Sequence, residues 1–289
     1  MPALETLRSF VNTWECDEND HLNVQFYFAK FEEADRQFRF MTGFSEAQAG
    51  PRRVRHVRYH GEMFVGSLVE ITSHAAFDGP YMLSIVHVMR DRSTGRIAAT
   101  ALDGYAPSDR AIKDIRKRLD NVIEEMPAVA APRSFEAVPA SLDAKDAELR
   151  AANAQLITRA TVLPRDCVLD GNADDRFVLA CLTDGAPHLW ESAGMTRPWL
   201  DKNDYGRVAL EMKLTRGMPI KAGTVLHVLS GITSVGDKTF TFRHHVFESA
   251  SQRLIAVMDV TAIIMDLENR KAVKLSEDAR NGLRSHMLG

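Results

Sequence analysis

The sequence predicts an α+β fold of two similar domains, each with a long helix packed across a curved antiparallel sheet. Residues 7–14 form an extended apolar segment, and apolar residues then recur at helical spacing over residues 24–41, up to a stop at Gly43. A run of extended segments follows, and the same order recurs in the second half of the chain. One helix across one antiparallel sheet is the simplest way to bury the apolar side of that helix.

The first domain is predicted from the segments that follow this helix. Each extended segment is bounded by turn residues, such as Asp-Gly-Pro at 78–80. The extended segments cover residues 52–64, 68–77, 81–90 and 96–105. Residues 108–126 return to helical spacing, with one apolar stripe and one charged face. We therefore assign residues 1–126 to the first domain.

A linker separates this domain from the second. Residues 127–139 are rich in Ala, Val and Pro, which is typical of a linker, and residues 141–152 are expected to add a short helix. We assign residues 127–152 to the linker and residues 153–289 to the second domain. The second domain repeats the order of the first, with extended residues 155–163, a turn at 164–172, a helix at 176–193, and extended residues 207–215, 224–234, 239–248 and 253–265.

The two domains share a register, which indicates an internal duplication. Several identical residues lie 157 positions apart, and the hydrophobic phase stays aligned over three strands. The identical pairs are Gly66 and Gly223, Gly79 and Gly236, His87 and His244, Arg96 and Arg253, and Ala99 and Ala256. A repeat of this length predicts two copies of one domain, because solenoid repeats are much shorter.

Composition excludes several classes of function. A net charge of -3 and a pI near 6.4 leave no basic footprint, so we expect no nucleic-acid partner. No apolar run approaches the roughly 20 residues of a membrane span, and no signal peptide is recognisable, so we expect no membrane partner. Three cysteines without a C-x-x-C pair fit reduced thiols in a cytoplasmic protein.

Chemistry is expected at the polar turn of residues 17–23, Asp-Glu-Asn-Asp-His-Leu-Asn, between the first strand and the helix. Backbone N–H groups at a helix start are unsatisfied and partly positive, so they can hold an anion or an oxyanion. Asn23 is equally consistent with a plain helix cap. Cys16 is not expected to be a nucleophile, because the residues around it are acidic and a thiolate needs a base or a positive field.

This turn resembles the motif of the hotdog-fold thioesterases. Asp17-x-Asn19-x-His21-x-Asn23, with Tyr27 following on the helix, is similar to the active-site run of the fatty acyl-ACP thioesterases. The resemblance implies a tandem double hotdog, in which the two domains form an internal pseudo-dimer.

A second feature resembles the 4-hydroxybenzoyl-CoA thioesterase-like hydrolases of acyl-CoA. These enzymes share the acid, the His-x-Asn pair and a Glu-Ala pair on the helix, which is Glu33-Ala34 in this chain. One residue departs from the pattern, since the family often has Gly immediately before the His and this chain has Asp20.

The resemblance implies a role for each motif residue. Asp17 would attack the thioester carbonyl or activate water, and both routes stay open. His21 would orient water or assist proton transfer, and Asn19 would position the carboxylate or the water. Backbone N–H groups near residues 23–25 would face the carbonyl oxygen, and no cofactor is needed beyond the CoA that is part of the substrate. The expected substrate contacts are Asn23, Val24, Tyr27, Arg58 and His60.

Other polar clusters carry weaker signals. His56 and His60 share one face of a strand, and His244 and His245 are adjacent, but neither pair has the acids or thiols of a metal site, so no metal is expected. The basic run of residues 52–58 has two interpretations. It is either a solvated edge of the sheet, or a surface that attracts the phosphates of CoA or an acidic carrier protein.

The second copy is expected to lack a working site. Anchoring Val11 to Val162 places Val168 opposite Asp17 and Asn172 opposite His21. A sliding alignment would instead bring Asp166 or Asp170 to the place of the acid. The degenerate domain is expected to supply one wall of the pocket, and the tandem is expected to dimerise further. Candidate wall residues of the pocket are His60, Arg216 and Trp190.

The sequence therefore predicts an acyl-thioester hydrolase that acts on acyl-CoA or on an acyl carrier protein. One alternative is an enoyl-thioester hydratase on the same fold. Those enzymes resemble Asp-x-Asn-Pro-x-His, in which the His follows a Pro and lies one residue later than His21. Another alternative is a protein that binds acyl-CoA without catalysis.

Overall fold

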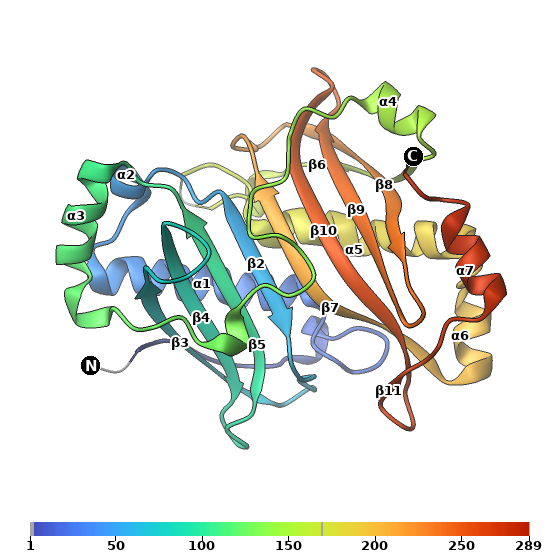
Figure 1. Ribbon diagram of the computed structural model, residues 1–289, viewed down its shortest axis with the longest axis horizontal. Helices are drawn as coiled ribbons and strands as arrows, with labels where there is room; N and C mark the ends of the chain where they lie inside the picture. The colour runs from blue at the N-terminus through green and yellow to red at the C-terminus, as the bar shows by residue number, and fades with distance from the viewer. Residues whose placement is uncertain (1–2, 169, 289) are drawn as a thin grey trace. The chain divides into compact units, whose positions relative to one another are not determined.

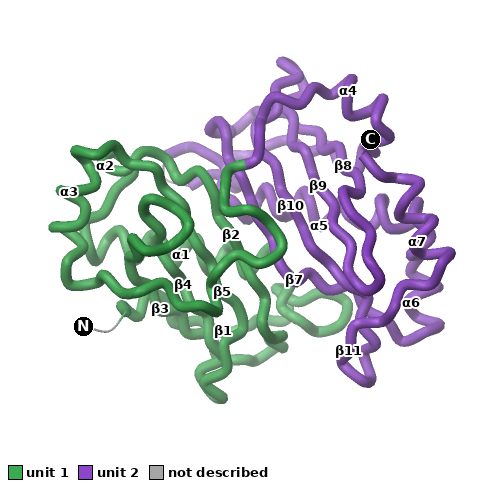
Figure 2. The backbone as a smooth tube through the Cα atoms, viewed as in Figure 1, with its two compact units in different colours: residues 1–139 green, residues 140–289 purple. Residues whose placement is uncertain are grey.

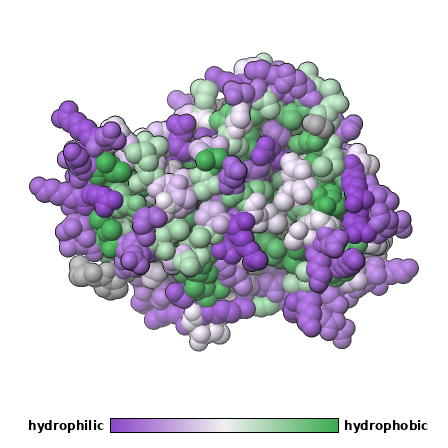
Figure 3. All heavy atoms as spheres, viewed as in Figure 1, coloured by the Kyte–Doolittle hydropathy of each residue, from purple (hydrophilic) through white to green (hydrophobic). Residues whose placement is uncertain are grey.

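A computed structural model describes residues 3–168 and 170–288. The chain divides into two compact units, Met1–Pro139 and Ala140–Gly289, which Figure 2 shows in green and purple. The expected linker, residues 127–152, is thus shared between the two units. In the view of Figure 3, hydrophobic residues form small groups between hydrophilic side chains. Among the described residues, no helix is long and apolar enough to cross a membrane.

Unit 1 is a five-stranded antiparallel sheet with a long helix across one face (Figure 1). The strand order is β1-β3-β4-β5-β2. The strands are β1 (Leu4–Phe10), β2 (Val54–Tyr59), β3 (Leu68–Ala76), β4 (Leu83–Asp91) and β5 (Ile97–Tyr105). The helices are α1 (Val24–Thr42), α2 (Glu46–Ala49) and α3 (Asp109–Arg118). This is the arrangement predicted for the first domain.

Unit 2 repeats this architecture, with strand order β7-β10-β9-β8-β6 and helix α5 crossing behind β8–β10 in Figure 1. The short strand β11 pairs with β10. The strands are β6 (Gln155–Thr161), β7 (Tyr205–Arg216), β8 (Val225–Val235), β9 (Thr239–Glu248), β10 (Arg253–Asp266) and β11 (Lys271–Ala272). The helices are α4 (Asp146–Ala151), α5 (Asp175–Ser192), α6 (Arg197–Asn203) and α7 (Glu277–Arg284). The predicted α+β class and the two similar halves are confirmed.

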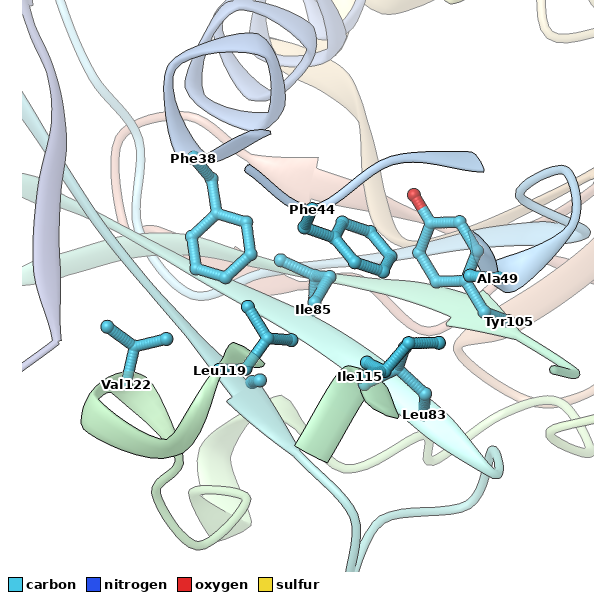
Figure 4. Packing of buried hydrophobic residues seen from close by; sticks show 10 residues of the cluster. Phe38, Phe44, Ala49, Leu83, Ile85, Tyr105, Ile115, Leu119 and Val122 are labelled. Carbon is cyan, nitrogen blue, oxygen red and sulfur yellow. The ribbon is translucent and has the colours of Figure 1, made fainter. Parts of the chain in front are cut away.

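Helix α1 forms where the sequence predicts it because both of its ends are specified. Asn23 caps its first turn, and Gly43 ends it in the left-handed conformation, with φ 67. The apolar side chains at helical spacing are fully buried against the sheet, as Phe28, Phe31 and Phe38 are. Figure 4 shows Phe38 packed in a cluster whose other labelled members are Phe44, Ala49, Leu83, Ile85, Tyr105, Ile115, Leu119 and Val122.

The duplication extends to individual backbone hydrogen bonds. In the first copy, the Val11 N–H donates to Ser67 O at 2.9 Å and the Gly66 N–H donates to Val11 O at 2.8 Å. The same two bonds recur at 2.9 and 2.8 Å around Val162 in the second copy, with Thr224 and Gly223 as the partners. In each copy a short helix lies in the connection between the central helix and the next strand, α2 in the first copy and α6 in the second.

Some predicted elements end earlier than expected. The first strand stops at Phe10, because Thr13–Glu15 forms a 3₁₀ helix in which the Glu15 carboxylate accepts the Asn12 N–H at 2.8 Å. The helix predicted over residues 108–126 ends at Arg118, and Asp120–Val122 is a 3₁₀ turn. Helices α2, α6 and α7 were not predicted from the sequence.

Candidate active site

Residues 16–22 form a tight hairpin that hydrogen bonds hold on both sides. The Asp17 N–H donates to His21 O at 2.8 Å, and Cys16 and Leu22 form an antiparallel bridge. The Leu22 N–H donates to Met63 O at 2.8 Å, which fixes the hairpin against the loop that precedes β3. The polar turn therefore has a defined backbone before any side chain is considered.

Asp20 occupies a left-handed conformation in this hairpin, with φ 59. Its counterpart in the second copy is Gly171, with φ 78. Asp adopts this region more readily than most side chains do, since its short polar group interacts locally. The departure from the family pattern thus keeps the backbone geometry that a Gly would supply.

Asp17 is half-buried, and one of its carboxylate oxygens is anchored by the turn. Its Oδ1 accepts the N–H groups of Asn19 at 2.9 Å and of His21 at 3.2 Å. Burial raises the pKa of Asp17, against the effect of these two hydrogen bonds. No donor from the described residues of unit 1 reaches Oδ2. This second oxygen can therefore act on a substrate or on a water molecule.

His21 pairs with an acid that the sequence did not identify. Its Nδ1 lies 3.3 Å from Oε1 of Glu62, and its ring meets the Phe64 ring edge-on at 4.8 Å. A carboxylate at Nδ1 fixes the orientation of the imidazole and leaves Nε2 for proton transfer. Glu62 lies in the loop between β2 and β3, 41 positions after His21 in the sequence. The aligned second copy has Pro219 at this position, so the acid, like His21, occurs only in the first of the two copies, and this difference could have pointed to Glu62.

The start of helix α1 offers one open backbone donor. The Asn23 side chain accepts the Gln25 N–H at 3.1 Å, so Asn23 caps the helix. The Asn23 N–H itself donates to Glu15 O at 2.9 Å. The Val24 N–H has no acceptor among the described residues of unit 1, and it lies at the partly positive end of the helix. Of the three N–H groups expected to face a carbonyl oxygen, only that of Val24 is available.

A buried ion pair fixes the chain on either side of the turn. The Lys30 ammonium lies 2.9 Å from Oε1 of Glu15, and it also donates to Phe10 O at 3.2 Å. Lys30 is 6% exposed and Glu15 is 9% exposed. Burial alone would raise the pKa of Glu15, but the Asn12 N–H and Lys30 lower it below its usual value.

The remaining predicted contacts have partners inside unit 1. Tyr27 is buried with its ring edge-on to Tyr59 at 5.1 Å, and burial raises its pKa, as expected for a core residue. Arg58 donates to the backbone carbonyls of Val129 and Ala131, each at 2.9 Å. His60 Nε2 lies 3.1 Å from Thr100 Oγ1. Substrate contact by these three residues stays a prediction.

Glu33, the acid of the Glu-Ala pair on the helix, lies on the solvent side of α1. Its carboxylate binds Arg36 at 2.8 Å and Gln37 at 3.1 Å. Burial would raise the pKa of Glu33, but these two partners lower it. The neighbouring Ala34 is fully buried. Glu33 therefore pairs with neighbours on its own helix and makes no hydrogen bond to the turn among the residues that the structure describes.

The second copy keeps the backbone of the hairpin but lacks the candidate catalytic side chains. The Val168 N–H donates to Asn172 O at 2.8 Å, as the Asp17 N–H does in the first copy. The alignment anchored at Val162 is therefore right, and no sliding is needed. Asp170 accepts the Asn172 N–H at 2.9 Å but is exposed. The apolar Val168 cannot supply a base or a nucleophile.

The residues suggested as pocket walls in unit 2 make local contacts. Arg216 binds Asp175 at 2.8 Å and the carbonyl of Ala173 at 3.0 Å, beside the degenerate turn. Trp190 is buried, with its ring edge-on to Phe242 at 4.7 Å. Trp190 is therefore a core residue of unit 2.

One buried cluster has the spacing of a metal site among the described residues. Ligand atoms of Asp35, His87 and Asp103 lie within 4.8 Å of one another. Arg55 binds both oxygens of Asp103, at 2.6 and 2.7 Å, and Ser73 lies 2.7 Å from His87. Burial alone would raise the pKa of Asp103, but the arginine holds it well below its usual range. These contacts fit an internal ion-pair network better than a cation site.

The two histidine pairs noted in the sequence, His56 with His60 and His244 with His245, do not act as pairs in the structure, because the members of each pair have different surroundings. His56 is buried, and His60 contacts Thr100 as described above. His244 and His245 are adjacent on β9, so their side chains point to opposite faces of the sheet. His244 contacts the Ser230 hydroxyl through its Nδ1, which repeats the pair of Ser73 and His87 in the first copy.

Comparisons with known proteins agree with this fold. Residues 162–283 match the family model of the thioesterase-like superfamily. The 12:0-ACP thioesterase from Umbellularia californica superposes with a TM-score of 0.60 at 12% identity, covering 89% of this chain and 93% of that chain. An acyl-ACP thioesterase from Bacteroides thetaiotaomicron gives a TM-score of 0.59 at 10% identity, covering 89% and 96%. No curated protein sequence matches.

Both solved structures are similar to this chain over nearly its whole length, which includes both copies. The family model falls on the second copy, which has lost the site side chains but kept the fold. The chain therefore has the tandem double-hotdog fold, and its residues 162–283 match the model of the thioesterase-like superfamily.

Proposed function

We propose that this protein hydrolyses acyl thioesters at Asp17. The observation that carries the proposal is the half-buried Asp17 carboxylate, which two backbone N–H groups hold beside the pair of His21 and Glu62. This constellation occurs in one copy of a duplicated hairpin and is absent from the other. Its location in a fold shared with acyl-ACP thioesterases supports the same reaction.

Each group has a task in the proposed reaction. Oδ2 of Asp17 either attacks the thioester carbonyl or takes a proton from a water molecule that attacks it. The Val24 N–H stabilises the oxyanion that forms on the carbonyl oxygen. When the C–S bond breaks, the thiolate takes up the proton that water loses, and Asp17 or Nε2 of His21 relays this proton while Glu62 holds Nδ1. In the route of direct attack, the same water hydrolyses the acyl anhydride formed on Asp17 and restores the carboxylate. No group beyond the thioester and water is required. After a single turnover in ¹⁸O-labelled water, label found in Asp17 by mass spectrometry of the protein would identify the route of direct attack.

The substrate class is a thioester of CoA or of an acyl carrier protein. Two solved structures with this fold are named acyl-ACP thioesterases, and this supports the carrier-protein thioester as a substrate to test first. Parallel assays with the same acyl group on CoA and on a carrier protein decide between them. A cytoplasmic location and a homodimer stay predictions, and light scattering tests the second.

Thiol release from wild type and from Asp17→Asn tests the proposal. Asn keeps an oxygen for the two backbone donors, so the fold is retained, but it cannot attack or take a proton. We expect a loss of at least about 100-fold in kcat. The matched control is Asp170→Asn, which changes the acid in the degenerate hairpin and should leave the rate unaltered.

Two results would contradict the proposal. If the wild type and Asp17→Asn release thiol equally slowly from a broad panel of thioesters, the protein binds acyl groups without catalysis. If an enoyl thioester is converted into a 3-hydroxyacyl thioester with no thiol released, the protein is a hydratase.

A further inference from the structure

Large apolar side chains are exposed around the candidate hairpin. Phe10 and Leu68 lie opposite each other where β1 meets β3. The Val65 N–H donates to Asp20 O at 3.3 Å, so the loop before β3 touches the hairpin itself. We call these residues the apolar rim, with exposed fractions of 47% for Phe10, 76% for Trp14, 40% for Phe64, 45% for Val65 and 44% for Leu68.

The second copy provides an internal comparison for this rim. Its backbone is the same, since Asn172 and Lys221 form the bridge that His21 and Phe64 form in the first copy. The side chains at the five positions are mostly polar or small, and they are Thr161, Arg165, Lys221, Ala222 and Val225. The largest change replaces the exposed Trp14 by Arg165. At these five positions, aromatic side chains therefore occur only in the copy whose hairpin retains the acid and the imidazole.

We infer that the apolar rim binds the acyl chain of the thioester, an inference that rests on the proposed function and extends it to substrate choice. A carbonyl held between Asp17 and His21 lies next to the Phe64 ring, which touches His21 at 4.8 Å. The chain attached to that carbonyl therefore starts at the rim. Covering exposed aromatic surface with an apolar chain removes both from water, which makes binding of the chain favourable.

The charge around the hairpin is unfavourable for binding of the CoA or carrier-protein end of the substrate at the apolar rim. Glu18 and Asp20 are exposed acids within the hairpin, and Glu62 lies beside His21. The phosphates of CoA and the acidic surface of a carrier protein would be repelled by these carboxylates. An uncharged aliphatic chain meets no such repulsion. The rim therefore selects for long acyl groups.

Trp14→Arg, which installs the residue of the second copy, tests this inference. Each methylene that the rim buries strengthens binding by about fourfold. We expect kcat/KM for dodecanoyl-CoA to fall at least about tenfold, while kcat/KM for butyryl-CoA changes less than about twofold. Trp14→Phe should restore most of the preference for the long chain. Arg165→Ala, at the equivalent exposed position of the second copy, is the matched control and should change neither value.

An equal loss for both substrates, or no loss for either, would overturn the inference. A second readout does not depend on turnover. Trp14 is exposed, so its fluorescence should shift to the blue when a non-hydrolysable dodecanoyl-CoA thioether binds, and free CoA should give no shift. This shift should disappear in Trp14→Phe. A shift in a protein that hydrolyses no thioester would refute the proposed function alone, whereas hydrolysis without a shift would refute the rim alone.

Discussion

Replacing Lys30 by Met should destabilise the protein because it leaves a buried carboxylate without its counter-ion. Lys30 contacts both oxygens of Glu15, at 2.9 and 3.1 Å, and both side chains are nearly excluded from water. Removing one partner of such a pair typically costs 3–5 kcal/mol. Glu15 keeps two donors on Asn12, at 2.8 and 3.0 Å. We therefore expect the lower end, a loss of about 3 kcal/mol in the free energy of unfolding.

The pH dependence of this loss follows from Glu15. Its pKa is lowered in the folded state, so its contribution to stability is complete above the unfolded value of about 4.3 and is lost as pH falls through the folded value. In Lys30→Met the carboxylate lacks the ammonium and takes up a proton more readily. The difference between variant and wild type should therefore be largest near pH 7 and smaller near pH 4.

Urea unfolding of four proteins measures the effect: wild type, Lys30→Met, Glu15→Gln and the double variant. The double variant should be more stable than the sum of the single losses by about 2 kcal/mol, because it leaves no uncompensated charge. Arg8→Ala, which removes an exposed ion pair with Glu5 on the same strand, is the control and should change little. A Lys30→Met variant as stable as Arg8→Ala would refute the reasoning.

Three further predictions concern the hairpin. Glu62→Gln should lower kcat about tenfold with KM unchanged, because the imidazole of His21 loses its charged partner; an unchanged kcat would exclude this role. Asp20→Gly should raise the free energy of unfolding by up to about 1 kcal/mol with unchanged turnover, since φ 59 suits Gly; thermal melts that show a loss would contradict this. Burial raises the pKa of Asp17, so kcat/KM should rise with pH through a midpoint above about 3.9, and a midpoint below it would disprove the assignment.

The sequence predicted the elements whose signals are local. The apolar spacing of α1, its Gly43 stop and the strand runs are all visible within short windows, and the structure confirms them. The 3₁₀ helix at Thr13–Glu15 was missed although its capping box, Asn12 with Glu15, is also a local signal. Lys30 was not recognised because it lies on the buried side of α1, where its charge interrupts the apolar pattern.

The candidate site was predicted only in part, because half of it depends on contacts distant in sequence. Asp17, Asn19 and His21 fall within one short motif, so spacing was sufficient to find them. Glu62 reaches His21 from the loop between β2 and β3, and no periodicity marks that position. The capping role of Asn23 was one of two readings, and only the 3.1 Å bond to Gln25 decided it.

Comparison of the two copies supports the proposal that Asp17 is retained for chemistry, because the hairpin also forms without an acid. A buried carboxylate whose pKa is raised binds its proton more tightly in the folded chain than in the unfolded one, so its ionisation near neutral pH destabilises the fold. The second copy builds the same hairpin with Val168 and avoids this cost. The fold therefore does not require an acid at this position, and its retention beside His21 and Glu62 is best explained by a reaction that uses the ionised carboxylate.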